Sequence, residues 1–169
     1  MFDPVTIALV AAGAVSTYGT LKAGHDAKVA GENQQTIANY NAQVAEQEGQ
    51  AAKQKAEYDA KIHADKVRSF LSMQRAEYGK SGIEASAGSP LLVMEDTVKK
   101  GKLDELAIKY GGDVAEINKR SEAGGLRMGG SLYKQAGKNA QTASYYQAGS
   151  SLLSSGAKVY GAYKYGSGG

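Results

Sequence analysis

Apolar side chains recur at seven-residue spacing between residues 32 and 78, in a background of helix-forming Gln, Glu, Lys and Ala. The repeat runs through Ile37, Val44, Ala51 and Tyr58. This spacing predicts one long helix with a thin apolar seam, because polar Asn, Gln and Lys interrupt it. Helices in proteins are stabilised mainly by the packing of a buried face, so this helix needs a neighbour.

A second helical arm is predicted over residues 90–148. Glycines near 111–112 and 124–130 weaken it, each by roughly 1 kcal/mol relative to Ala. They either interrupt the helix or lie where another backbone comes close. The apolar residues of this arm keep the three- and four-residue spacing of a packed stripe: Leu103, Leu106, Tyr110, Val114 and Ile117.

The chain has 2 Pro residues, Pro4 and Pro90, and each marks a helix start. Pro4 follows Asp3 and Pro90 follows Ser89, which is the N-cap residue followed by Pro at the first helical position. Between the arms, a Gly/Ser break at residues 79–89 reverses the chain direction, and Ile83 within it would anchor a partner. The residues expected to form this inter-arm turn are Gly79, Gly82, Ile83, Gly88, Ser89 and Pro90.

Small residues dominate both ends of the chain. Residues 1–31 predict an apolar small-residue helix, and residues 149–169 form a segment in which Gly and Ser alternate with Tyr and Lys. The strongly apolar stretch at 5–15 is shorter than the ~20 residues that cross a bilayer. Small-residue spacing lets helices approach closely in protein or in lipid, so these ends contact either sister copies or a membrane. The candidate contact residues are Ile7, Val10, Gly13, Gly19, Leu152, Leu153, Gly156, Tyr160 and Tyr163.

The composition leaves little material for a bulky core. Leu, Ile, Val and Phe together number 29 of 169 residues, whereas Gly alone numbers 22 and Tyr 11. A net charge of +3, from 20 Lys and Arg against 17 Asp and Glu, is too small to indicate nucleic-acid binding. We therefore expect a chain that packs by close backbone approach and needs copies of itself to complete its core.

No chemistry-bearing motif stands out. The absence of Cys excludes disulfides and thiolate metal sites. The two histidines, His25 and His63, are expected to face solvent on helices, and no nucleotide-binding, zinc-protease or serine-hydrolase pattern occurs. Adjacent carboxylates at 95–96 and 104–105 indicate charged helix faces, because neighbours on a helix point about 100° apart. We expect no catalytic residues, no cofactor and no metal.

The layout resembles the small internal virion (ejection) proteins of short-tailed bacteriophages. The resemblance covers nearly the whole chain as an arrangement of helices and is sharpest between Arg75 and Leu92. Residues that match position by position are confined to the break: Gly79, Gly82, Gly88, Ser89 and Pro90. It implies a protein held in the capsid near the portal, which leaves through the tail ahead of the DNA and assembles in the host envelope as part of a conduit. The implied partners are sister copies, other ejection or portal and tail proteins, the envelope membrane, and DNA that passes through the lumen without sequence-specific binding.

The fold expected from these observations is an all-α long helical hairpin with small-residue N- and C-terminal helices, assembling as a homo-oligomeric ring or tube. The leading functional hypothesis is a virion ejection protein. The alternative is a virion structural protein that is not ejected, such as a helical adaptor or plug at the portal or tail. A holin-like membrane-permeabilising protein is less favoured, because the arms are too polar and no stretch reaches spanning length.

Overall fold

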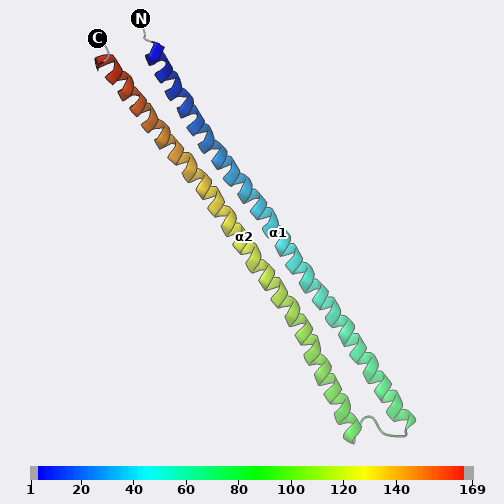
Figure 1. Cartoon of the computed structure of the whole chain (residues 1–169). Helices are drawn as coiled ribbons and strands as arrows, with labels where there is room; N and C mark the ends of the chain where they lie inside the picture. The colour runs from blue at the N-terminus through cyan, green and yellow to red at the C-terminus, as the bar shows by residue number, and fades with distance from the viewer. Residues whose placement is uncertain (1–3, 166–169) are drawn as a thin grey trace. The chain divides into compact units, whose positions relative to one another are not determined.

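The computed structural model of this chain consists of two long helices joined by a loop (Figure 1). Helix α1 spans Pro4–Lys80 and helix α2 spans Gly88–Tyr165. The structure describes the backbone of residues 4–165 and the side chains of residues 15–158, 160, 161 and 164. The described residues contain no strand, which confirms the all-α fold class.

Both helices are longer than the sequence predicts. The predicted boundary between 31 and 32 does not exist, and α2 runs without interruption through 111–112 and 124–130. The segment after residue 148 is not a separate element either, because α2 continues to Tyr165. No Pro follows the first turn of either helix. The largest local penalty is therefore that of Gly, about 1 kcal/mol each, which packing against a second helix can offset.

Glycines at positive φ form the turn between the helices. Gly82 has a φ of 67° and Gly88 a φ of 64°, a conformation that residues with a Cβ rarely adopt. The Ile83 N–H donates to the Tyr78 carbonyl at 3.0 Å and the Gly82 N–H donates to the Gly79 carbonyl at 3.2 Å. This pair of hydrogen bonds, with Gly82 as the left-handed residue, is the Schellman arrangement that ends a helix.

The connection is shorter than the predicted break. Residues 81–87 lie outside the helices, whereas Gly79 still belongs to α1. Helix α2 begins at Gly88, so Ser89, the predicted N-cap, lies inside the first turn, and Pro90 is the third helical residue rather than the first. The position of the reversal was correct, and its width was overestimated because Gly and Ser at helix ends are compatible with both helix and loop.

The chain divides into two compact units. The loop unit comprises Asn41–Gly124, and the terminal unit comprises Met1–Tyr40 and Gly125–Gly169. Each unit is an antiparallel pair of helix segments, one from α1 and one from α2. In the loop unit Ala56 faces Gly112 and Val67 faces Gly101, so that later residues of α1 meet earlier residues of α2.

The terminal unit pairs its segments in the same antiparallel sense. Gly31 faces Gly137, and Gly24 faces Ser144. Nearer the chain ends, the hydroxyl oxygens of Thr17 and Ser151 lie 3.3 Å apart in a hydrogen bond.

Small residues form the core of both units. Among the described side chains, no large one is fully buried. The buried apolar residues are Met94 and five alanines: Ala42, Ala45, Ala60, Ala123 and Ala148. Two helices can approach closely only where small side chains meet, so backbone proximity replaces the bulky core of an ordinary helical pair.

Candidate functional site

The surface where α1 and α2 meet, which we call the seam, depends on glycine in both units. In the terminal unit, a Cβ added at Gly137 would lie 2.7 Å from the Ala27 carbonyl oxygen. One added at Gly31 would lie 2.6 Å from the Tyr133 carbonyl oxygen. The obstructing atoms belong to the backbone of the opposite helix, so only separation of the helices could make room. The sequence left two explanations open for the glycines near 111–112 and 124–130. For Gly112 and Gly130 the correct one is close approach, because an added Cβ would lie 3.4 Å from Lys53 Cα and 3.3 Å from Gln35 Cα of α1.

Ion pairs fix the register of the loop unit across the seam. Lys53 of α1 donates to Glu116 of α2 at 3.1 Å and lies 3.1 Å from the Asp113 carboxylate. Lys119 of α2 lies 2.9 Å from the Glu48 carboxylate of α1. Hydrogen bonding to Glu116, and then to Asp113, raises the pKa of Lys53. These contacts orient the segments, although exposed ion pairs contribute little to stability.

A second ionic cluster lies along α2. Hydrogen bonds from Lys102 and then Lys109 lower the pKa of Glu105 to about 2. The two Lys Nζ atoms lie 2.8 and 2.6 Å from the Glu105 oxygens. Glu105 is therefore ionised at any physiological pH.

The two histidines differ in environment. His25 is exposed, as predicted. The prediction is wrong for His63, whose side chain is only 29% exposed and whose Nε2 lies 3.8 Å from Asp104 Oδ2. Its Nδ1 is buried without a hydrogen-bond partner among the described residues. Residue 63 falls on the same helical face as the seam alanines, which hydropathy alone did not indicate.

Large apolar side chains of the loop unit lie on the outer faces of both helices. Leu103 is 66% exposed, Tyr110 70% and Tyr58 64%. Leu103 is nine residues from the seam Gly112, and Tyr110 is nine residues from the seam Gly101. Nine residues correspond to about two and a half turns, so these side chains lie opposite the seam.

The predicted packed stripes are therefore not the seam. Of the second-arm stripe, Leu103, Leu106, Tyr110 and Ile117 are exposed, and Val114 is half-buried. In the first arm, Ile37 and Tyr58 are exposed while Val44 is half-buried. The seven-residue spacing in the first arm and the three- and four-residue spacing in the second each identified an apolar face of a helix. However, α1 and α2 meet through the opposite faces, where smaller residues allow closer contact.

The terminal unit has the same distribution. Met128 and Tyr146 are exposed, and each is nine residues from the seam Gly137. Tyr40 is exposed and nine residues from the seam Gly31. Both units thus have small residues between their helices and large apolar residues outside.

Most of the predicted contact residues with described side chains are on this exterior. Leu152, Leu153 and Tyr160 are exposed, Leu153 at 78%. A Cβ added at Gly19 or Gly156 would meet no atom within 4 Å, so neither glycine belongs to the seam. The remaining four lie within the helices, but their side chains are outside the part that the structure describes: Ile7, Val10, Gly13 and Tyr163.

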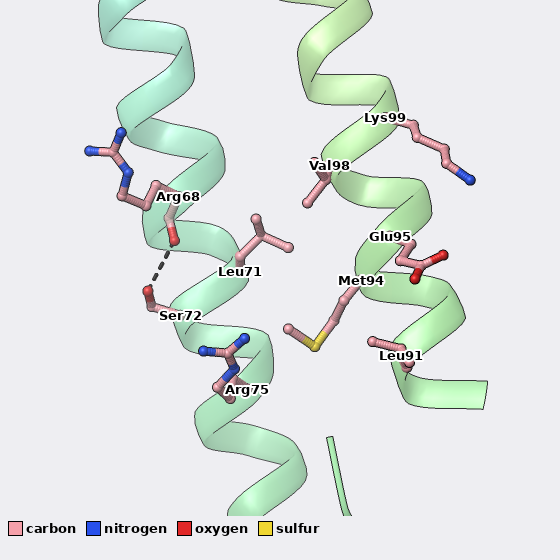
Figure 2. Close-up of a pocket in the computed structure, with 9 residues that line it drawn as sticks. All are labelled: Arg68, Leu71, Ser72, Arg75, Leu91, Met94, Glu95, Val98 and Lys99. Carbon is pink, nitrogen blue, oxygen red and sulfur yellow. Dashed lines mark hydrogen bonds between the residues drawn. The ribbon is translucent and has the colours of Figure 1, made fainter. Parts of the chain in front are cut away.

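A groove between the helices of the loop unit was not predicted from the sequence. It encloses about 460 Å³ and has an apolar floor made by Leu71, Leu91, Met94 and Val98. Figure 2 shows Leu71 of α1 and Met94 and Val98 of α2 directed into the space between the helices. Polar and charged residues complete its lining: Arg68, Ser72, Arg75, Glu95 and Lys99.

The groove occurs where the seam changes composition. Farther from the loop, the facing residues are Ala and Gly, as at Ala56 and Gly112. Near the loop, Leu71 of α1 and Met94 of α2 line the space between the helices, and their side chains are much larger than those of Ala and Gly.

Neither helix contains, within its described residues, a stretch long and apolar enough to cross a membrane. Those residues also hold no group of three or more His, Asp or Glu side chains placed to bind a metal ion. No family model, curated protein or solved structure matches this chain.

Proposed function

We propose that several copies of this chain associate through the outer faces of α1 and α2 into a helical ring or tube. The supporting observation is the distribution of apolar residues, with Gly and Ala in the seam and exposed Leu, Ile, Met and Tyr outside. Extended apolar surfaces on a protein commonly mark sites of association. Because the outer faces of the two helices lie on opposite sides of each unit, one copy offers a surface to a neighbour on either side. Such head-to-tail contacts generate rings when they close.

We further propose that this assembly is an internal virion protein of a short-tailed bacteriophage, ejected with the genome to form part of a conduit across the host envelope. The resemblance at the inter-arm turn supports this assignment. A core of Ala and Gly without disulfides also suits passage through a narrow tail, since little packing is lost on unfolding. A net charge of +3 suits a lumen that passes DNA without retaining it, because tight phosphate binding requires many cationic contacts.

In this proposal, the exposed residues near the chain ends contact sister copies or the envelope. They include Gly19, Leu152, Leu153, Gly156 and Tyr160. The same role is proposed for Ile7, Val10, Gly13 and Tyr163, whose side chains lie outside the part that the structure describes. Before ejection, the protein would lie in the capsid near the portal, next to other ejection or tail proteins.

The decisive experiment measures this protein in purified phage particles before and after DNA release, by quantitative mass spectrometry normalised to the capsid protein. We expect it in full particles and expect its loss from emptied ones. Retention at an unchanged copy number in emptied particles would refute ejection. It would instead favour the alternative of a fixed helical adaptor or plug at the portal or tail.

A further inference from the structure

We propose that the groove of the loop unit binds an acidic amphipathic helix of a different protein. This inference goes beyond the association of copies, because the groove lies between the helices and not on their outer faces. It concerns the apolar floor at Leu71, Leu91, Met94 and Val98 and the charged residues around it.

The shape of the groove suits a helical segment. Its lining residues span about two turns of each helix, from Arg68 to Arg75 on α1 and from Leu91 to Lys99 on α2. An open trough between two helices is the surface on which a third helix places apolar anchors at three- and four-residue spacing. Val98 is 49% exposed and Leu91 37%, so the floor presents apolar surface that an anchor residue would cover.

The charges around the groove determine the chemistry of the occupant. Three cationic side chains, Arg68, Arg75 and Lys99, line it together with one carboxylate, Glu95. Arg68 is paired with Asp65 at 3.0 Å. Neither Arg75 nor Lys99 makes an ion pair with any residue in the described part of the chain. Figure 2 shows Arg68 and Lys99 extending outward from the two sides of the apolar floor.

This excess of positive charge disfavours a second copy of the same surface and favours a partner with carboxylates. Two identical grooves placed face to face would bring cations against cations, which is unfavourable. A helix with Leu or Ile anchors flanked by Glu or Asp would fill the floor and place carboxylates near Arg75 and Lys99. A lipid membrane is a different kind of occupant for the groove, and co-sedimentation with vesicles distinguishes it from a protein helix.

The test uses the full-length protein and a fluorescein-labelled synthetic helix of about 16 residues, with Leu anchors on one face and Glu flanking them. Two further probes replace every Glu by Lys or every Leu by Ser. We expect fluorescence anisotropy to show saturable binding of the acidic probe and none of the other two. Equal binding of the Lys probe, or no binding of the acidic probe at micromolar protein concentration, would overturn the proposal.

Two pairs of variants locate the site. The double variant Arg75→Gln/Lys99→Gln removes the unpaired charges, and Lys55→Gln/Lys61→Gln removes the same charge from exposed lysines that do not line the groove. We expect the first to weaken binding about 3- to 30-fold and the second to change it less than about 2-fold.

The apolar floor is tested in the same way by Val98→Ser against Val93→Ser. These are two valines of α2 with 49% and 47% exposure, of which only Val98 lines the groove. Weaker binding of the Val98 variant alone is expected, and equal effects of the two substitutions would overturn the assignment. Co-sedimentation with phosphatidylglycerol vesicles completes the test. Binding of vesicles but not of the acidic peptide, with the same dependence on Arg75 and Lys99, would refute a protein partner.

Discussion

Adjacent glycines in α2 give a direct test of the small-residue seam. Substitution of Gly112 by Ala places a methyl group against the Cβ of Ala56 and 3.4 Å from the Cα of Lys53. The same substitution at Gly111 meets no atom within 4 Å. The two positions are adjacent in the same helix, but Gly112 is buried against α1 whereas Gly111 is exposed.

The two substitutions are expected to change the free energy of unfolding differently. In a helix interior, Gly→Ala adds about 0.8–1.0 kcal/mol of helix propensity, so Gly111→Ala should stabilise the protein by about that amount. At Gly112 the same gain is opposed by overpacking, which costs typically about 1–3 kcal/mol. The obstructing Ala56 Cβ cannot rotate away, and relief requires separation of the helices. Gly112→Ala should therefore be less stable than Gly111→Ala by about 1–3 kcal/mol.

The assay is urea denaturation followed by far-ultraviolet circular dichroism at one fixed protein concentration. Fixed concentration is necessary because the proposed association would contribute to the apparent stability. Adding Ala56→Gly to Gly112→Ala removes the obstructing methyl, and the double-mutant cycle should show a favourable coupling of similar size. Equal stability of Gly111→Ala and Gly112→Ala, with no coupling to position 56, would refute the close seam.

Two further predictions concern association and pH. Leu103→Ser combined with Tyr110→Ser should lower the mass of the assembly in sedimentation velocity without loss of helical circular dichroism, because both side chains lie opposite the seam. Val93→Ser is the control. An unchanged mass for the double variant would exclude this face as a contact between copies. Hydrogen bonds from Lys102 and Lys109 hold the pKa of Glu105 at about 2, below its ordinary value of 4.5. Their stabilising contribution is therefore complete above pH 4.5 and is lost as the pH falls to about 2. Glu105→Gln should unfold at lower urea than the parent at pH 7, and the difference should disappear near pH 2; a pH-independent difference would contradict this role.

The sequence was sufficient to predict the all-α class and the reversal of the chain between two long helical arms, but not the extent of each helix. Long runs without an internal Pro, the Pro residues at both helix starts, and the Gly-rich segment near Gly82 and Gly88 are local signals. Local signals determine helix ends and turns, because capping and positive φ depend on the residue itself. The sequence left open whether the glycines inside α2 interrupt the helix, and α2 continues through them because packing against α1 offsets a penalty that single-residue propensity counts in full.

The face through which the helices meet was not predictable from hydropathy. Spacing showed that Leu103 and Tyr110 share a face, but it contains no information about what covers that face. The seam has its own repeat of small residues, at Gly24 and Gly31 in α1 and at Gly130 and Gly137 in α2. A search for small residues at seven-residue spacing could have found it. The groove depends on Leu71 of α1 and Met94 of α2 lining the same space, which requires the antiparallel register and not the sequence of either helix alone.

We propose that this chain lacks the interior to be stable alone and is completed by sister copies. Sedimentation equilibrium of the full-length protein over a wide concentration range measures whether such copies associate. We predict a mass that is a multiple of 17.6 kDa, together with unfolding that depends on protein concentration. A species of 17.6 kDa at every concentration, with cooperative and concentration-independent unfolding, would show that the chain is stable without sister copies.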